Sequence, residues 1–145
     1  METGRLGSAK RIVIIDTNTL LYMAQGLIPP STLLEEAYYP RLATTSRVIE
    51  ELNYIIGKGR PLDAKRARTA LGLIERLGVE VLPWDGEGDA DDSIEWVATT
   101  LKHAGHRVMV ATSDRELRER LRMKGIPTIY YRRSRGGVEV EWDTP

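Results

Sequence analysis

Aspartates follow two apolar, β-branched segments of this sequence. Asp16 comes directly after residues 12–15, and Asp114 lies three residues beyond residues 108–111. Either aspartate alone is explained as the N-cap of a following helix. A carboxylate at the end of a buried strand costs free energy unless it has a partner. The presence of both aspartates therefore indicates a functional site that uses their carboxylates.

More acids lie at the start of a helix predicted after residue 88. Asp89, Asp91 and Asp92 fall within four residues of one another. Acidic side chains favour a helix N-terminus, but three aspartates exceed what capping needs. Their mutual repulsion would be relieved by a cation.

Two neighbouring glutamates occupy the helix predicted after residues 42–44. Glu50 and Glu51 cannot share a helix face. Glu51, three residues after Val48, is nearer to the apolar stripe than Glu50 is. An exposed helix glutamate is the ordinary interpretation of each one alone.

Four acidic groups are thus expected to face one crevice. Converging carboxylates without Lys or Arg among them suit hard cations such as magnesium or manganese. The common use of such a cluster is metal-assisted cleavage of a phosphodiester. Polar neighbours are placed to support it: Asn18 follows Asp16, and Thr112 and Ser113 precede Asp114.

The elements that must position these groups alternate along the chain. Predicted strands and helices in alternation indicate a parallel sheet with helices on both faces, whose ligand site lies beyond the carboxyl ends of the strands. The strands are expected at residues 12–15, 42–44, 79–82, 108–111 and 127–131, with 138–142 as a short edge strand. The helices are expected at residues 17–24, 31–38, 46–56, 63–77, 89–103 and 114–124.

Length and composition indicate one globular domain. The chain has 145 residues, 41% of them hydrophobic and 29% charged, so residues 1–145 form a single domain, of which 1–10 are expected to be a flexible N-terminal segment. The lack of cysteine excludes disulfides, thiolate zinc sites and thiol nucleophiles. No run of apolar residues is long enough for a membrane span, and no signal peptide is recognisable, so a cytoplasmic protein is expected.

Charge is balanced overall but unevenly distributed. The 21 basic and 21 acidic residues cancel, yet residues 85–95 hold six acids and no base, and residues 115–135 are rich in arginine. An acidic helix start beside a solvated basic face is the ordinary explanation of such a distribution.

Four short motifs, in this order, resemble those of a PIN domain. They are DTN, VIEEL, DADDSIEWVA and ATSDREL, each after a predicted strand, and the resemblance runs from about residue 12 to residue 131. It implies an α/β fold, a three-layer α/β/α sandwich with a central, mostly parallel five-stranded sheet. The stretch from Ala90 onward looks most like archaeal stand-alone PIN proteins and their eukaryotic relatives in ribosomal RNA processing. VapC-type toxins share the motifs more loosely.

The resemblance also implies a function, since PIN domains are metal-dependent endoribonucleases that use Mg²⁺ or Mn²⁺. Carried over motif by motif, the catalytic acids are Asp16, Glu51, Asp91 and Asp114. The metal ligands implied are Asp16, Asp91 and Asp114 with Asp92, and the supporting residues are Asn18, Thr112, Ser113 and Glu50. Which of Glu50 and Glu51, and which of Asp91 and Asp92, is the primary ligand stays open.

An RNA substrate would need basic groups near these acids. Lys and Arg contacts with phosphates supply affinity without reading sequence, and Arg115, Arg118, Arg122 and Arg132 are the candidates. A homodimer through the helix at 49–56 or at 30–38 is possible, as is an antitoxin or a ribosome-assembly partner. The rival interpretation is a non-catalytic RNA-binding or assembly module with the same fold. A dehalogenase-type phosphatase, a receiver domain and a P-loop NTPase lack their required residues here.

Overall fold

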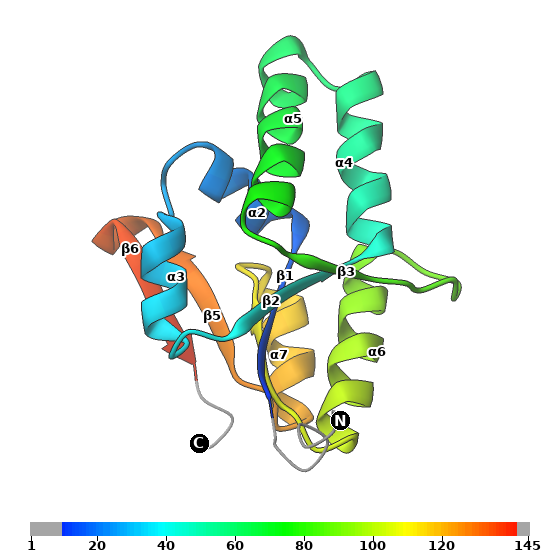
Figure 1. The fold of residues 1–145 in the computed structure, drawn as a ribbon, viewed down its shortest axis with the longest axis vertical. Helices are drawn as coiled ribbons and strands as arrows, with labels where there is room; N and C mark the ends of the chain where they lie inside the picture. The colour runs from blue at the N-terminus through cyan, green and yellow to red at the C-terminus, as the bar shows by residue number, and fades with distance from the viewer. Residues whose placement is uncertain (1–9, 142–145) are drawn as a thin grey trace.

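A six-stranded sheet forms the centre of the computed structural model, which describes residues 10–141 (Figure 1). The strand order is β3-β2-β1-β4-β5-β6, and every neighbouring pair is parallel except β5 and β6. The strands are β1 (Arg11–Ile15), β2 (Arg41–Thr45), β3 (Glu80–Leu82), β4 (Arg107–Ala111), β5 (Thr128–Arg132) and β6 (Gly137–Glu141). The central pair, β1 and β4, thus ends at the predicted aspartates.

Six helices surround this sheet. They are α2 (Thr17–Ala24), α3 (Pro30–Glu36), α4 (Ser46–Lys58), α5 (Pro61–Arg76), α6 (Ala90–His103) and α7 (Arg115–Met123). Helix α6 packs on β2 and β4 and α7 packs on β5, while α3 lies against β6. Helices α4 and α5 stand side by side beyond the carboxyl end of β1 (Figure 1). The predicted three-layer, mostly parallel α/β class is confirmed.

The sheet has six strands, not the predicted five. Residues 137–141 join it because a short 3-10 turn, Arg133–Arg135, and a left-handed Gly136 with φ 63° reverse the chain after β5. β6 then pairs antiparallel with β5 along its whole length. The predicted edge segment extended to Trp142, which lies outside the described residues, as do residues 1–9 of the predicted flexible segment.

The hydrophobic core lies mainly between the sheet and its covering helices. Its largest fully buried side chains include Ile14, Ile94, Leu117, Leu121 and Ile129. Within the described residues, no helix is both long and apolar enough to cross a bilayer.

Helix α3 differs from its prediction in a way that affects dimerisation. It ends at Glu36 instead of residue 38 because Tyr38 and Tyr39 take left-handed conformations before Pro40. Leu33 and Ala37 are buried within this chain. They are therefore not available as an apolar face for a second copy.

Candidate active site

The sheet itself fixes the position of Asp16. In the β1–β4 register Ile15 lies opposite Ala111, and the Asp16 N–H donates to the Ala111 carbonyl at 3.0 Å. The side chain then turns back to cap α2, with Oδ1 accepting from the Thr19 N–H at 2.8 Å. Asp16 is buried. Its carboxylate is thus held rigidly at the end of the central strand.

Asp114 is held in the same way at the end of the neighbouring strand. Its Oδ1 accepts from the Leu117 N–H at 2.8 Å and caps α7. Its own N–H donates to Thr112 Oγ1 at 3.1 Å. The Thr112 side chain also acts on Asp16, whose pKa it lowers against the rise caused by burial. Thr112 therefore lies beside both aspartates.

Asp91 reaches the same place from the first turn of α6. That helix begins at a capping box in which the Asp92 N–H donates to Asp89 Oδ1 and the Asp89 N–H donates to Asp92 Oδ2, both at 2.9 Å. The preceding loop is held by Arg47, which donates to the carbonyls of Gly86 and Gly88 at 2.8 and 2.7 Å. The start of α6 is thereby fixed against α4.

Glu51 comes from α4 and is oriented by the residue after Asp16. The Thr17 hydroxyl donates to Glu51 Oε1 at 2.5 Å. Its neighbour Glu50, exposed like Glu51, forms an ion pair with Arg47 at 3.3 Å instead. Two adjacent glutamates therefore have different surroundings.

These side chains line one cavity of about 190 Å³. Its walls are Asp16, Thr17, Asn18, Glu51, Asp89, Ala90, Asp91 and Asp114. The structure thus brings together the four acids predicted to be catalytic. Thr17, which is adjacent to Asp16, was missed, and Asp89 was named only as part of the acidic helix start and not as a site residue.

Two carboxyl groups that line this cavity have raised pKa values. Burial raises the pKa of Asp16, with a further contribution from the charge of Asp114. The pKa of Asp91 is raised to about 6, first by burial and then by the charges of Asp114 and Asp16. The carboxylates repel one another without a compensating cation among them.

The donor set suits a hard divalent cation, although the carboxylates are not gathered around one point. Within residues 10–141, no group of three or more acidic or histidine side chains is placed to hold a metal ion. One oxygen each of Asp16 and Asp114 is used in a helix cap, which leaves the other for a ligand. Asp91 is half-buried, so its side chain has room to move. Mg²⁺ and Mn²⁺ prefer oxygen ligands, and the charge of a bound ion would stabilise carboxylates whose pKa is raised.

Asp92, Glu50 and Ser113 lie outside the cavity walls. Asp92 accepts from Arg120 at 3.1 Å, and its pKa is lowered first by the Asp89 N–H. Arg120 also pairs with Glu95. The Ser113 hydroxyl accepts from the Tyr131 N–H at 3.2 Å and so supports β5. The structure gives these side chains supporting contacts around the site.

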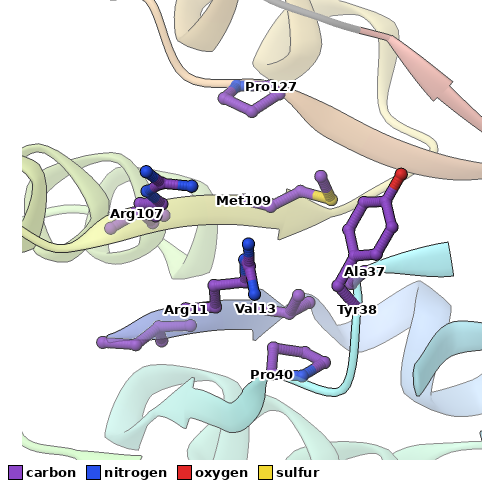
Figure 2. Close-up of a pocket in the computed structure, with 10 residues that line it drawn as sticks. Arg11, Val13, Ala37, Tyr38, Pro40, Arg107, Met109 and Pro127 are labelled. Carbon is purple, nitrogen blue, oxygen red and sulfur yellow. The ribbon is translucent and has the colours of Figure 1, made fainter. Parts of the chain in front are cut away.

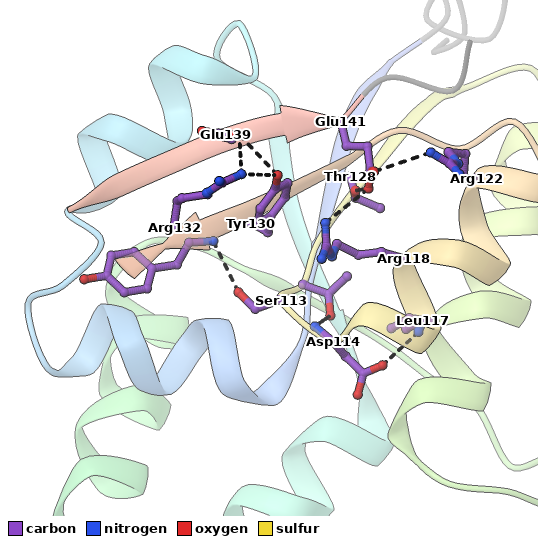
Figure 3. A network of polar contacts seen from close by, with 12 residues as sticks. Ser113, Asp114, Leu117, Arg118, Arg122, Thr128, Tyr130, Arg132, Glu139 and Glu141 are labelled. Carbon is purple, nitrogen blue, oxygen red and sulfur yellow. Dashed lines mark hydrogen bonds and ion pairs between the residues drawn. The ribbon is translucent and has the colours of Figure 1, made fainter. Parts of the chain in front are cut away.

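Three of the four arginines predicted to bind RNA are paired within the chain (Figure 3). Arg118 and Arg122 contact Glu141 at 3.3 and 3.6 Å, and Arg132 contacts Glu139 at 3.3 Å. Arg118 also lies 4.0 Å from the centroid of the Tyr130 ring. These contacts fasten β6 to α7 and β5. Arg115 is exposed.

A second hollow of about 170 Å³ lies at the amino-terminal ends of β1 and β4 (Figure 2). Apolar groups such as Val13, Met109 and Pro127 line it, with Arg11 and Arg107 at its edge. None of the described residues that line it is acidic. It offers no ligands for a hard cation.

Comparison with known proteins places this geometry in a family. The model of a PIN-like domain matches residues 13–134. The chain belongs to the PIN-like domain family. It is 29% identical to ribonuclease VapC9 of Archaeoglobus fulgidus over 133 residues, which covers 90% of each protein. The solved structure of the PIN domain endonuclease Utp24 matches with a TM-score of 0.70 and 27% identity, covering 90% of this chain and 91% of that one. Both of these relatives are nucleases by name.

Proposed function

We propose that this protein is an endoribonuclease that hydrolyses RNA phosphodiester bonds and depends on Mg²⁺ or Mn²⁺. The observation that carries the proposal is that Asp16, Glu51, Asp91 and Asp114 line one cavity at the carboxyl ends of the central strands. The likeness to a ribonuclease and to a PIN domain endonuclease over 90% of the chain supports the same class of reaction.

Asp16, Asp91 and Asp114 are the residues that would hold the metal. When bound, such an ion lowers the pKa of a coordinated water and stabilises the leaving oxygen of the phosphodiester. The helix caps on Asp16 and Asp114 fix where their carboxylates stand before substrate arrives, which avoids reorganisation during the reaction. The products would be ends with a 5′ phosphate and a 3′ hydroxyl.

Glu51 would orient the attacking water. The hydrogen bond from Thr17 fixes one of its oxygens, so the other is the one that accepts a proton from that water. Asn18 is exposed on the cavity wall, where its amide would contact the substrate. Asp89 adds negative charge at the wall and keeps α6 in place.

The test is cleavage of a mixed pool of structured and single-stranded RNA by the pure protein. We expect cleavage with manganese or magnesium, none with EDTA, and none after Asp16→Asn. Glu51→Gln should also lose the activity, whereas Glu50→Gln, which makes the same change outside the cavity, should keep it. Cleavage that is equal in the Asp16→Asn and wild-type proteins would reject the proposal.

Cut positions would then separate a role in RNA processing from a VapC-type toxin role with an antitoxin partner. No cleavage, combined with no effect of manganese on the melting temperature, would favour the alternative of a non-catalytic RNA-binding or assembly module. A ribosome-assembly partner belongs to that alternative.

A further inference from the structure

A second cavity along α2 and α4 follows the acidic one. It is distinct from the apolar hollow at the amino-terminal ends of β1 and β4. It has a volume of about 200 Å³ and is lined by Leu21, Gln25, Ile55, Gly59, Asp63 and Arg66. It contains one cationic side chain, from the first turns of α5. This cavity has no part in the metal site described above.

Helical spacing places the two cavities in sequence. On α2, Asn18 of the acidic cavity shares a face with Leu21 and Gln25 of the second, because they recur at intervals of three and four. On α4, Glu51 shares a face with Ile55 in the same way. At 1.5 Å per residue, the step from Glu51 to Gly59 is about 12 Å along the helix axis. The two cavities therefore lie one after the other along α2 and α4, and we refer to this line of two cavities as the groove.

The far end of this groove is basic. Residues 58–68 hold five basic side chains and one acid. Four of the basic side chains are exposed and Arg66 is half-buried in the cavity wall. Among the described residues, this set forms one ion pair, between Arg60 and Asp63 at 3.4 Å. Its other cations are therefore available to an anion.

This surface contrasts with the arginines after Asp114. Arg118, Arg122 and Arg132 have carboxylate partners on β6, and a phosphate would have to displace those partners. Lys58 and Arg66 have no such competitor in the described part of the chain. Lys58 also lies seven residues after Glu51, on the same face of α4.

An aromatic side chain lies between the acid and the base on α4. Tyr54 is 68% exposed and lies three residues after Glu51 and four before Lys58. An exposed ring next to cations is the arrangement that binds single-stranded nucleic acid, because unpaired bases stack on the ring while phosphates contact the cations. The stripe from Glu51 to Lys58 has this arrangement.

We infer that the groove between α2 and the α4–α5 pair holds the single-stranded RNA that flanks the cleaved bond, with Lys58 and Arg66 on its phosphates and Tyr54 against a base. This inference rests on the proposed function for the identity of the polymer. It assigns substrate binding to the α4–α5 tip and gives the arginines of α7 and β5 a structural role.

The test is binding of a fluorescein-labelled 12-nucleotide single-stranded RNA of mixed sequence, measured by anisotropy in EDTA so that no cleavage occurs. Lys58→Gln with Arg66→Gln should weaken binding about tenfold and reduce the salt slope by about 1.4, since each single-strand phosphate contact contributes about 0.7. Arg66→Lys should keep most of the affinity, because a lysine still contacts a phosphate. Tyr54→Ala should weaken binding several-fold.

Matched controls carry the same change of charge elsewhere. Arg11→Gln with Arg107→Gln alters the hollow at the opposite ends of the strands and should change the affinity less than twofold. Arg115→Gln with Arg122→Gln tests the stretch after Asp114. A larger loss in either control than in the Lys58 and Arg66 pair would overturn the inference, as would equal affinity for a duplex of the same sequence. Circular dichroism melts confirm that each variant is folded.

Because binding is measured without metal or cleavage, the two proposals fail in different ways. If the wild-type protein binds this RNA through Lys58 and Arg66 but cuts no RNA, the result contradicts the proposed nuclease activity and supports RNA binding in the groove. If the protein cuts RNA and the Lys58 and Arg66 variant binds RNA with undiminished affinity, the result contradicts RNA binding in the groove and leaves the nuclease activity standing.

Discussion

Each aspartate at the ends of the central strands has two roles. Asp16 and Asp114 both cap a helix with one oxygen and line the acidic cavity. Capping and function are therefore not rival explanations for these residues. At Asp16 the cap holds a charge that burial and the nearby charge of Asp114 would otherwise disfavour.

Asp91 should destabilise the metal-free protein at neutral pH. Its pKa in the folded protein is about 6, above the 3.8 of the free group. Between these values the folded state binds more protons than the unfolded state, so stability falls as pH rises through this window. After a discount for solvent screening of a half-exposed group, Asp91→Asn should raise the free energy of unfolding at pH 7 by about 1 kcal/mol.

Urea unfolding at pH 7 and pH 4 without metal measures this effect. The gain from Asp91→Asn should shrink at pH 4, where Asp91 is protonated in the folded wild type, and manganese should no longer raise the stability of the variant. Asp85→Asn, an exposed aspartate outside the cavity, should leave stability unchanged. A metal-free variant that is less stable than wild type at pH 7 would argue against charge repulsion in the cavity.

Thr17 should act on the reaction through Glu51. Thr17→Val keeps the shape of the buried side chain but removes its hydrogen bond to Glu51 Oε1. We expect kcat to fall about fivefold with little change in KM, because a lost orienting bond of about 1 kcal/mol affects the chemical step. Steady-state cleavage kinetics test this, and a variant with wild-type kcat would show that Glu51 needs no such support.

At the scale of elements, the loop before α6 depends on a side chain from α4. Arg47 donates to two loop carbonyls, and its guanidinium lies 5.1 Å from the centroid of the Trp84 ring. This loop delivers Asp89 and Asp91 to the cavity. The site is therefore assembled by contact between two helices as well as by the sheet.

Arg47→Gln should loosen that loop without unfolding the domain. We expect a loss of about 1 kcal/mol in the free energy of unfolding, since two partly exposed hydrogen bonds and a cation–π contact are removed. Hydrogen exchange of the amides at residues 84–89 should accelerate, and more manganese should be needed for the same stabilisation. Unchanged exchange at these amides would mean that the loop is held by its own turns.

At the scale of the whole molecule, the mostly parallel sheet and the gathering of the four acids at its carboxyl edge were predictable from sequence, whereas the strand order was not predicted. Short β-branched runs alternating with helices required a parallel sheet, and its carboxyl edge had to collect the residues that follow each strand. Which of Asp91 and Asp92 lines the cavity was not predictable from the sequence. This depends on which way the first turn of α6 faces and on Arg120, a residue 28 positions away from Asp92.

The arginines show that a charge run in the sequence does not reveal which of its members are paired in the fold. Residues 115–135 look like a basic surface because their acidic partners, Glu139 and Glu141, come later in the sequence and meet them only when β6 folds back on β5. The edge segment predicted at residues 138–142 joins the sheet as β6, and the same step pairs these arginines with its glutamates. A chain reversal at Gly136 produces both.

A homodimer, if it forms, should use the partly buried edge of α4 that carries Ile49 and Ile56. Ile49 and Ile56 are seven residues apart on one face, are only partly buried, and lie on the side of the helix opposite to Glu51. Sedimentation equilibrium should show a mass that rises with concentration, and Ile49→Glu should abolish the rise. A monomer mass at every concentration would remove this interface.

The proposed function requires that the acidic cavity hold the metal used for RNA cleavage. Anomalous diffraction from crystals grown with manganese tests it most directly. We expect a manganese peak bounded by the carboxylates of Asp16, Asp91 and Asp114, and its loss in Asp91→Asn crystals. Manganese bound instead at Asp92 and Glu95, or absent from the cavity at concentrations that support cleavage, would contradict it.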